Sequence, residues 1–323
     1  MILFALNSSR DFGEAVALEL DMSLGEHEEV EFEDEEHKCR PLENVRGRNI
    51  FVIQSLYSDN DKSANDKLIR LLFFISTLKD ASARHVTAIV PYLCYARKDR
   101  KTKSRDPISS RYIAQLFEAA GTDHIVTIDV HNIQAFQNSF RIPSENLEAR
   151  KIFAGYLTPE IVNDDVVILS PDIGGIKRAE QFQRTIAKHI LNIPALAFME
   201  KYRSSGQVWG EAVVGEVRDK TVIIIDDLVS TGGTLARSAA ACKQAGAKKI
   251  LAFATHGLFT GHPDKNLEEE GLQRIVVTNT IPPFRLEGTT VKEKLKVLNV
   301  APLFAEAIKR MDEGGSISDL LEN

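Results

Sequence analysis

The chain has 323 residues, of which 43% are hydrophobic and 27% charged, a balance typical of a globular protein with room for about two domains. Its formal net charge of −6 at pH 7 does not favour binding to nucleic acid or to an anionic membrane. No apolar run reaches membrane-spanning length, and we expect no signal sequence because the first apolar run is short and lacks a basic start. Cys39, Cys94 and Cys242 are isolated, which predicts reduced thiols in a cytoplasmic protein.

The first distinctive segment, residues 26–38, is strongly acidic and reads EHEEVEFEDEEHK. Such a run of like charge is typical of a solvated strand edge. Further along, residues 66–78 and 108–120 read as helices, and we expect a strand between them within residues 81–95. Strands that alternate with helices predict a parallel sheet with helices on both faces.

A cluster of basic residues follows that strand in this otherwise acidic protein: Arg97, Lys98, Arg100, Lys101, Lys103 and Arg105. The cluster suits a polyphosphate ligand, both by its charge and through the two-pronged hydrogen bonding of arginine. A solvated basic loop is the alternative, and the residues alone do not decide between the two.

Residues 128–131 read IDVH and place Asp129 and His131 at the end of a predicted strand. Because side chains two residues apart in a strand point the same way, we expect both on one face. A lone histidine after a strand is more often structural than a ligand, so this pair alone predicts no site.

Another predicted strand, residues 166–169, leads into the sequence SPDIGG at residues 170–175. Bare amides in such a strand–loop–helix turn can contact an anion, although a simple glycine turn is the alternative. The polar segment of residues 200–216 contains Lys201 and Arg203, and we expect it to be a mobile loop. Basic residues in a loop usually serve only solubility, but here they could also close over a phosphate.

The most specific pattern lies within residues 221–250. A β-branched run at residues 221–225 predicts a buried strand, the carboxylates of Asp226 and Asp227 follow it, and residues 235–245 read as a helix that Gly246 stops. The tight loop before this helix consists of Ser230, Thr231, Gly232, Gly233 and Thr234. It lacks both the GK[ST] ending of a Walker A motif and the GxGxxG of a dinucleotide fold.

This loop presents amides, hydroxyls and a helix N-terminus to an anion. Two acids beside it suit a ligand that carries vicinal hydroxyls next to its phosphate. The pattern therefore predicts binding of a ribose 5-phosphate group. An ordinary strand–turn–helix is the alternative, but it does not account for the acids and hydroxyls together.

The sequence repeats its own pattern, which indicates two related halves. Residues 81–95 resemble residues 245–259, and residues 121–131 resemble residues 271–281, in the same order. We predict an α/β protein with two tandem domains, residues 1–145 and 146–300, each a mostly parallel sheet flanked by helices. Residues 301–323 are expected to form a helix and tail that pack on the N-terminal half.

Nine strings between residues 32 and 259 resemble the ribose-phosphate diphosphokinase (PRPP synthetase) family: FEDEEH, VRG, PYLCYARKDRK, SRDPIS, IDVH, SPDIGG, EKYR, DDLVSTGGT and ATHGLF. The resemblance covers nearly the whole chain. The resemblance implies that both domains are of the phosphoribosyltransferase type. It also implies transfer of the β,γ-diphosphoryl group of ATP to the C1 hydroxyl of ribose 5-phosphate, with Mg²⁺ as cofactor. The products would be phosphoribosyl diphosphate (PRPP) and AMP.

The resemblance further implies roles for particular residues. An adenine turn at residues 32–36 and a nucleotide loop that begins at residue 97 would bind ATP through Phe32, Asp34, Glu35, Glu36, Arg97 and Lys98. A diphosphate loop would contain Asp172, Gly174 and Gly175. A ribose-phosphate site would contain Arg203, Asp226, Asp227 and the loop Ser230, Thr231, Gly232, Gly233 and Thr234. Lys201 and Arg203 would be catalytic, and His131 and Asp172 would lie at the magnesium site, where Asp172 is the more natural oxygen ligand.

Two positions depart from the family pattern, because Lys98 replaces a usual glutamine and Ser230 a frequent acid. The resemblance also implies a homo-oligomer, a dimer or hexamer, in which the adenine turn reaches a neighbour's nucleotide pocket. Two alternatives remain open. One is a phosphoribosyltransferase that consumes PRPP, and the other is a non-catalytic regulatory subunit of the same family.

Overall fold

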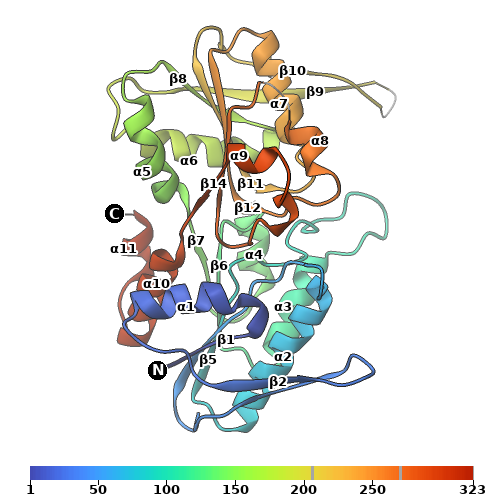
Figure 1. The fold of residues 1–323 in the computed structure, drawn as a ribbon, viewed down its shortest axis with the longest axis vertical. Helices are drawn as coiled ribbons and strands as arrows, with labels where there is room; N and C mark the ends of the chain where they lie inside the picture. The colour runs from blue at the N-terminus through green and yellow to red at the C-terminus, as the bar shows by residue number, and fades with distance from the viewer. Residues whose placement is uncertain (205–206, 269–270, 323) are drawn as a thin grey trace. The chain divides into compact units, whose positions relative to one another are not determined.

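The computed structural model describes residues 1–204, 207–268 and 271–322, except for the side chains of residues 201–211 and 322. By its internal contacts the chain forms two compact units, Met1–Glu148 with Val300–Asn323, and Ala149–Asn299. Each unit is built around its own sheet (Figure 1). Among the described residues, no helix is both long and apolar enough to cross a membrane.

The first unit contains a five-stranded parallel sheet with the strand order β1-β4-β5-β6-β7. Its strands are β1 (Ile2–Ala5), β4 (Asn49–Ile53), β5 (His85–Ile89), β6 (His124–Ile128) and β7 (Ser144–Leu147). The three central strands are apolar and buried along most of their length, which is typical of a parallel sheet covered on both faces.

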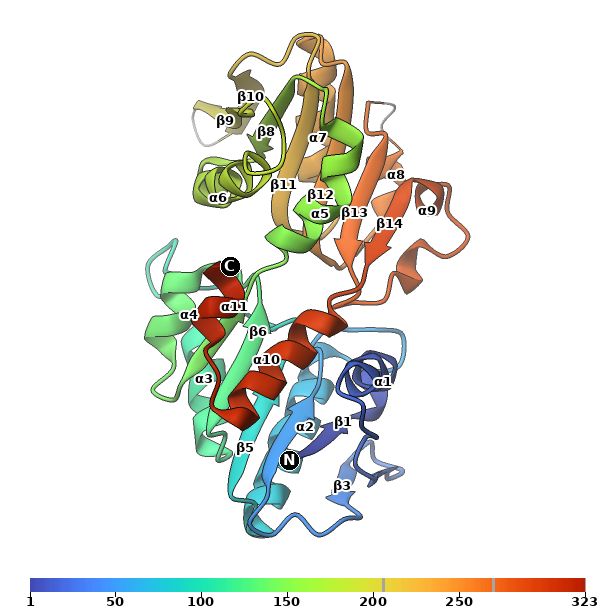
Figure 2. The ribbon, with the colours of Figure 1, turned by 90° about the vertical axis from the view of Figure 1, so that its left-hand side faces the viewer.

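Helices cover the two faces of this sheet (Figures 1 and 2). Helices α2 (Ala64–Asp80) and α3 (Ser109–Ala119) lie on one face, and α1 (Arg10–Glu19) and α10 (Ala301–Glu313) on the other. The helices predicted at residues 66–78 and 108–120 are therefore confirmed. The 3₁₀ helix η1 (Asn7–Ser9) and helices α4 (Ile133–Ser139) and α11 (Ile317–Glu322) also belong to this unit.

Helix α10 joins the first unit by aromatic packing on α1. Phe12 of α1 and Phe304 of α10 meet edge to face, with ring centroids 5.5 Å apart, and Phe304 is fully buried. The apolar residues of α10 that follow at helical spacing, Ala307 and Ile308, are fully buried as well. The apolar stripe read from APLFAEAIKRM is thus the surface that fixes this helix to the unit.

We expect Phe304→Ala to destabilise the protein by about 3–5 kcal/mol, because the substitution leaves a cavity the size of a phenyl ring between α10 and α1. Urea denaturation followed by circular dichroism measures the loss. Phe73→Ala is the matched control, since Phe73 is 57% exposed in the single chain and its loss should cost about 1 kcal/mol or less. If Phe304→Ala cost as little as the control is expected to cost, α10 would contribute little to the stability of the unit.

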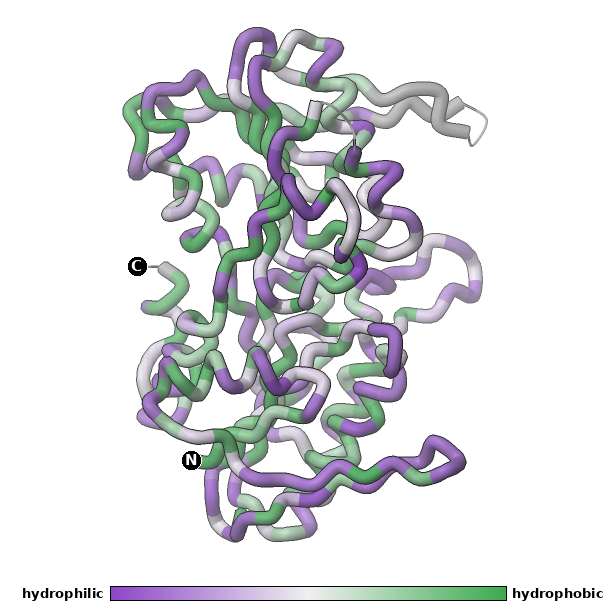
Figure 3. The backbone as a smooth tube through the Cα atoms, viewed as in Figure 1, coloured by the Kyte–Doolittle hydropathy of each residue, from purple (hydrophilic) through white to green (hydrophobic). Residues whose placement is uncertain are grey.

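The acidic segment near the N-terminus forms an antiparallel hairpin of β2 (His27–Glu31) and β3 (His37–Pro41). Most residues of this hairpin are hydrophilic, as the colouring of Figure 3 shows. The hairpin is not solvated on both faces, however, because His37 stacks on Phe73 of α2 and Cys39 is buried. The interpretation of the whole segment as a solvated strand edge is therefore wrong for the face that lies against α2.

The second unit contains a seven-stranded sheet with the order β10-β9-β8-β11-β12-β13-β14, in which only β10 is antiparallel to its neighbour. Its strands are β8 (Val166–Ser170), β9 (Ala195–Ser204), β10 (Gln207–Val214), β11 (Thr221–Val229), β12 (Lys249–Gly257), β13 (Arg274–Thr278) and β14 (Leu295–Leu298). Its helical elements are α5 (Arg150–Ile161), η2 (Ile173–Gly175), α6 (Ile176–Ile186), α7 (Gly233–Gln244), α8 (Pro263–Leu267), η3 (Phe284–Leu286) and α9 (Val291–Lys294).

Alternate residues of the central strands pack on opposite faces of this sheet. Val222 and Ile224 of β11 belong to a core with Leu235 of α7. On the opposite face, Phe253 of β12 contacts Phe153 of α5 and Phe182 of α6 with centroid separations of 5.5 and 6.2 Å. The predicted architecture of parallel sheets flanked by helices is thus confirmed, and both faces of the sheet that carries the predicted phosphate loops are rigidly packed.

Two local predictions for this unit are wrong. The segment expected to be a loop, residues 200–216, contains the end of β9 and all of β10, and Lys201 lies opposite Glu211 where these strands pair. Strand β11 also continues past Ile225 through both aspartates to Val229, because β12 supplies hydrogen-bonding partners as far as Gly257. Both aspartates therefore belong to the strand itself rather than following it, and the loop begins after Val229.

Candidate active site

The two predicted phosphate loops follow neighbouring strands of the second unit. The chain leaves β8 through α6 to reach β9 on one side, and it leaves β11 through α7 to reach β12 on the other side. The direction of winding therefore reverses between β8 and β11. In open α/β sheets, ligands bind outside the carboxyl ends of the strands at such a reversal. The topology of the sheet thus brings both loops to the position where a ligand is expected.

The ribose-phosphate loop, residues 230–234, passes through Gly232 in the left-handed region, with φ of +78°. Helix α7 begins at Gly233 directly after it. The loop is held from outside by Asn266, whose side-chain amide donates to the Thr231 carbonyl at 2.7 Å. The hydroxyls of Ser230 and Thr260 lie 3.1 Å apart, and the Thr260 amide donates to the Ser230 carbonyl at 2.9 Å. The amides at the start of α7 are thus held in a fixed cradle for an anion.

We expect Gly232→Ala to weaken ribose 5-phosphate binding by about tenfold or more while the protein stays folded. A Cβ at this position would lie 2.6 Å from Leu267 Cγ, and the left-handed φ strains any L-residue, so the loop must shift. Isothermal titration calorimetry with ribose 5-phosphate measures the change. Gly288→Ala is the control, because Gly288 is also left-handed but has open space around its Cβ. Unchanged affinity in Gly232→Ala would mean that the phosphate does not bind to this loop.

Asp226 and Asp227 lie on β11 just before the loop, and both carboxylates face Arg178 of α6. The Arg178 Nη1 lies 3.5 Å from Asp226 Oδ1 and 3.3 Å from Asp227 Oδ1. Burial, followed by the charge of Asp227, raises the pKa of Asp226 well above its ordinary value, and Arg178 opposes the shift. Ionising both carboxylates together is therefore less favourable than ionising two ordinary aspartates.

The diphosphate loop is built around Asp172, which accepts a hydrogen bond from the Gly175 amide at 3.0 Å. The Ser170 hydroxyl donates to the Asp172 carbonyl at 2.6 Å. A Cβ on Gly175 would lie 2.7 Å from Ser170 Oγ and 3.7 Å from Arg178 Nη1. Gly175 thus keeps the loop close to Arg178, and this arginine lies between the loop and the acid pair.

The residues predicted to hold magnesium differ in how well they fit it. Asp172 is exposed and offers a carboxylate oxygen, the donor that Mg²⁺ prefers. His131 is also exposed, but it lies in the first unit and offers only nitrogen. The prediction that Asp129 and His131 share a strand face is wrong, because β6 ends at Ile128 and Asp129 adopts a φ of +43°. The alternation of side chains therefore stops before either residue.

The side chains of Lys201 and Arg203 lie outside the described residues, so their predicted catalytic role is carried by the sequence alone. Their backbone belongs to β9, the strand next to β8. Strand β9, which carries both residues, and strand β8, which leads into the diphosphate loop, therefore lie on the same side of the point where the winding reverses.

In the first unit, residues 32–36 form the turn at the tip of the β2–β3 hairpin. The Phe32 amide donates to the Glu36 carbonyl at 2.8 Å, and Asp34 accepts from the Glu36 amide at 3.2 Å. Glu35 adopts a left-handed φ of +67°. Phe32 is 47% exposed, and the four acidic side chains of the turn, Glu33, Asp34, Glu35 and Glu36, are exposed as well. A stacking surface and carboxylates are thus presented together at one exposed tip.

The nucleotide loop is organised by Asp106, which the sequence analysis did not identify. Its carboxylate accepts from Lys98 Nζ at 2.6 Å and from the Thr102 and Lys103 amides at 3.0 and 2.9 Å. Hydrogen bonds from Lys98 and Thr102 hold the pKa of Asp106 below its ordinary value. The positive charge of Lys98 is therefore compensated inside the loop, while Arg97 is exposed.

Arg178, Asn266 and Asp106 are thus the residues of these sites that sequence reasoning missed. Arg178 could have been found from helical spacing, because it lies three residues after Gly175 on the first turn of α6. Asn266 gives no local signal, since it contacts Thr231 from 35 positions away.

Two α/β units, one of which carries the predicted phosphate loops at the reversal point of its sheet, define an α/β protein with a fold of the phosphoribosyltransferase type. Residues 1–121 match the N-terminal domain of ribose phosphate pyrophosphokinase, and residues 174–322 match the phosphoribosyl synthetase-associated domain. The chain is 38% identical over 323 residues to the ribose-phosphate pyrophosphokinase of Hyphomonas neptunium, covering 100% of both chains. It is 40% identical over 319 residues to that of Caldanaerobacter subterraneus subsp. tengcongensis, covering 98% of this chain and 96% of the relative.

A solved structure agrees with these similarities. The crystal structure of phosphoribosylpyrophosphate synthetase from Mycobacterium smegmatis superimposes with a TM-score of 0.88 at 35% identity, covering 97% of this chain and 99% of that one. The chain therefore belongs to the ribose-phosphate pyrophosphokinase (PRPP synthetase) family. The predicted family and fold class are both confirmed.

Proposed function

We propose that this protein transfers the β,γ-diphosphoryl group of ATP to the C1 hydroxyl of ribose 5-phosphate. The observation that carries the proposal is the pair of phosphate loops after β8 and β11, with two carboxylates and Arg178 between them. One loop suits the 5-phosphate of the sugar, the acids suit its vicinal hydroxyls, and the other loop suits the diphosphate being transferred.

In this mechanism the C1 oxygen attacks the β-phosphorus, the bond between the β-phosphorus and the α,β-bridging oxygen breaks, and AMP leaves. The C1 hydroxyl proton passes to solvent or to a neighbouring base. Asp226 and Asp227 accept hydrogen bonds from the ribose hydroxyls, and the amides of residues 231–234 hold the 5-phosphate, so the attacking oxygen is held in place. Lys201 and Arg203 neutralise the charge that develops on the phosphoryl oxygens.

We propose Mg²⁺ as the cofactor, for which Asp172 would offer an oxygen ligand and His131 a nitrogen, the latter directly or through a water. When bound, Mg²⁺ supplies charge neutralisation at the transferred phosphoryl group. Asp172 has one carboxylate oxygen committed to the Gly175 amide, which orients the side chain. ATP is proposed to bind through Phe32, Asp34, Glu35 and Glu36 at the adenine turn and through Arg97 with Lys98.

We further propose a homo-oligomer, a dimer or hexamer, whose adenine turn completes the nucleotide site of a neighbouring subunit. The turn presents an exposed aromatic ring among exposed acids at the tip of a hairpin, where a single chain gains nothing from it. We propose a cytoplasmic location, which is supported by the three cysteines, all of them buried and unpaired.

A single assay tests the function against its two rivals. Phosphorus NMR of the protein with ATP, ribose 5-phosphate and Mg²⁺ should show AMP and PRPP appearing together. Consumption of added PRPP with a purine or pyrimidine base would identify a phosphoribosyltransferase instead. An inert protein that alters the activity of a catalytic relative would identify a regulatory subunit.

A further inference from the structure

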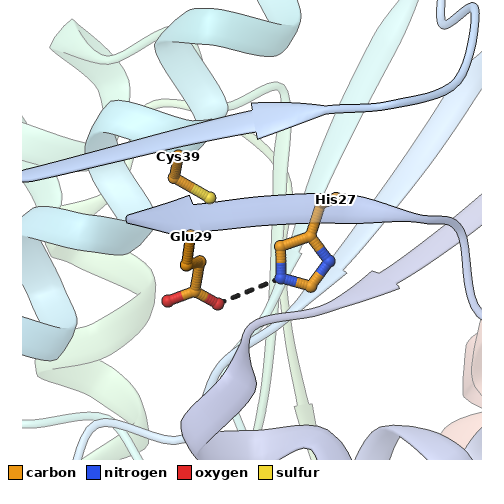
Figure 4. A group of neighbouring side chains, drawn as sticks. All are labelled: His27, Glu29 and Cys39. Carbon is orange, nitrogen blue, oxygen red and sulfur yellow. Dashed lines mark hydrogen bonds and ion pairs between the residues drawn. The ribbon is translucent and has the colours of Figure 1, made fainter. Parts of the chain in front are cut away.

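The β2–β3 hairpin carries a cluster of potential metal ligands that has no part in the reaction proposed above. His27, Glu29 and Cys39 lie on the inner face of the hairpin, and Glu29 is paired directly with Cys39 across the two strands. His27 and Glu29 are two residues apart on one strand, so their side chains point the same way. Figure 4 shows the imidazole, the carboxylate and the thiol gathered on that side.

The ligand atoms are close together and shielded from water. His27 Nε2 lies 3.0 Å from Glu29 Oε1, and one ligand atom from each of the three residues lies within 4.8 Å of the others. The side chains of His27 and Glu29 are only 4% and 9% exposed, and Cys39 is buried. For comparison, two ligands each about 2.1 Å from a zinc ion lie roughly 3.4 Å apart at a tetrahedral angle. Small side-chain rotations therefore suffice to enclose an ion.

The surroundings hold the ligands in place. The Asn7 amide donates to Glu29 Oε1 at 2.6 Å, and Arg70 Nη1 lies 4.0 Å from the other oxygen, Glu29 Oε2. Glu29 can therefore remain paired with Arg70 through Oε2 while Oε1, the oxygen next to His27, binds an ion. Phe4 and Phe74 close the cluster from the core, with ring centroids 6.2 and 5.6 Å from that of His27. Hydrogen bonds behind a ligand and an apolar enclosure are the usual surroundings of a structural metal.

We propose that His27, Glu29 and Cys39 form a structural site for a zinc-type divalent transition metal, with a water as the fourth ligand. One nitrogen, one sulfur and one carboxylate oxygen form a donor set that Zn²⁺ accepts and Mg²⁺ does not. On binding, the S–H bond of Cys39 breaks, an S–Zn bond forms and the proton leaves to solvent. The ion, the thiolate and the carboxylate then sum to zero charge, which limits the cost of burying them.

The site would act by fixing the hairpin whose tip is the adenine turn. A bound ion would link β2 to β3 at the Glu29–Cys39 pair. Two further residue pairs, Val30 with Lys38 and Glu31 with His37, separate this pair from the turn. Metal loading should therefore raise the stability of the first unit whether or not the proposed diphosphoryl transfer is correct.

Metal binding by the full chain tests the site directly. Protein stripped with chelator is dialysed against Zn²⁺ in the presence of excess Mg²⁺, and the bound metal is measured by mass spectrometry. We expect about one tightly held zinc ion per chain. Replacing Zn²⁺ with Co²⁺ should give a thiolate-to-cobalt charge-transfer band in the near ultraviolet, which carboxylate sites elsewhere in the chain cannot produce.

Matched cysteine variants assign the band. Cys39→Ala should abolish it and weaken metal binding by more than about 100-fold, whereas Cys94→Ala should change neither, although both thiols are buried in the same core. Cys39→Val, which fills the volume of the thiol, serves if the alanine variant does not fold. Absence of a cobalt–thiolate band in the wild-type chain, or its survival in Cys39→Val, would overturn the proposal.

Discussion

Asp226→Asn should make the protein more stable at neutral pH while weakening its affinity for ribose 5-phosphate by about 100-fold. The loss of affinity follows from removing charge-assisted hydrogen bonds to the sugar hydroxyls, each typically worth about 1.5–3 kcal/mol. The gain in stability follows from the pKa of Asp226, which burial and the charge of Asp227 raise above its ordinary value. A residue that destabilises the fold and binds the ligand is typical of a functional site.

The sign of the pH dependence can be derived from the raised pKa. Between about pH 4, where an unfolded aspartate ionises, and the raised pKa of the folded protein, the folded state binds more protons than the unfolded state. The contribution of Asp226 to stability is therefore present in acid and is lost as the pH rises through its folded pKa. In Asp226→Asn this loss should disappear.

Urea denaturation of the wild-type protein and the variant at several pH values, together with calorimetric titration of ribose 5-phosphate, measures both effects. Asp165→Asn is the control, because Asp165 is exposed next to the amino end of β8, at the opposite edge of the sheet from the loops. If Asp226→Asn lowers stability at neutral pH, the carboxylate is a structural partner of Arg178, and its assignment to the sugar is wrong.

The sequence predicted best the features whose cause lies within a few residues. The helix of α7, the glycine loop before it and the strand of β8 each depend on local composition and spacing, and all three were found. The amphipathic pattern of α10 likewise predicted a packed helix. Short-range patterns of this kind specify an element before its neighbours are known.

The features that were missed depend on which strands become neighbours. Arg178 meets Asp226 and Asp227 only because β8 and β11 are adjacent, although 48 positions separate Arg178 from Asp226. The length of β11 depends on β12, and strands β9 and β10 depend on a mutual pairing that the polar sequence does not indicate. Glu29 is a similar case, because an acidic run gave no reason to expect one carboxylate buried beside a histidine and a cysteine.

Lys201→Ala should lower kcat by about 10²–10³-fold and leave the affinities for both substrates within a few-fold of the wild-type values. A cation that meets the phosphoryl oxygens only as charge develops stabilises the transition state more than the bound substrates, so its loss appears in kcat. The magnitude is that expected for the loss of one oxyanion-stabilising donor. Steady-state kinetics with both substrates varied measures the change, and substrate affinities are checked separately by calorimetry because KM need not equal Kd.

Two further variants make the Lys201 result specific. Lys188→Ala removes an exposed lysine of the same unit that belongs to no proposed site, and it should leave kcat unchanged. Lys201→Arg keeps the charge but spreads it over a planar group, so it should recover only part of the lost rate. If Lys201→Ala instead raised KM at unchanged kcat, the lysine would bind substrate and transition state equally. The charge that develops in the transfer would then have to be neutralised by Arg178, Arg203 and Mg²⁺ without it.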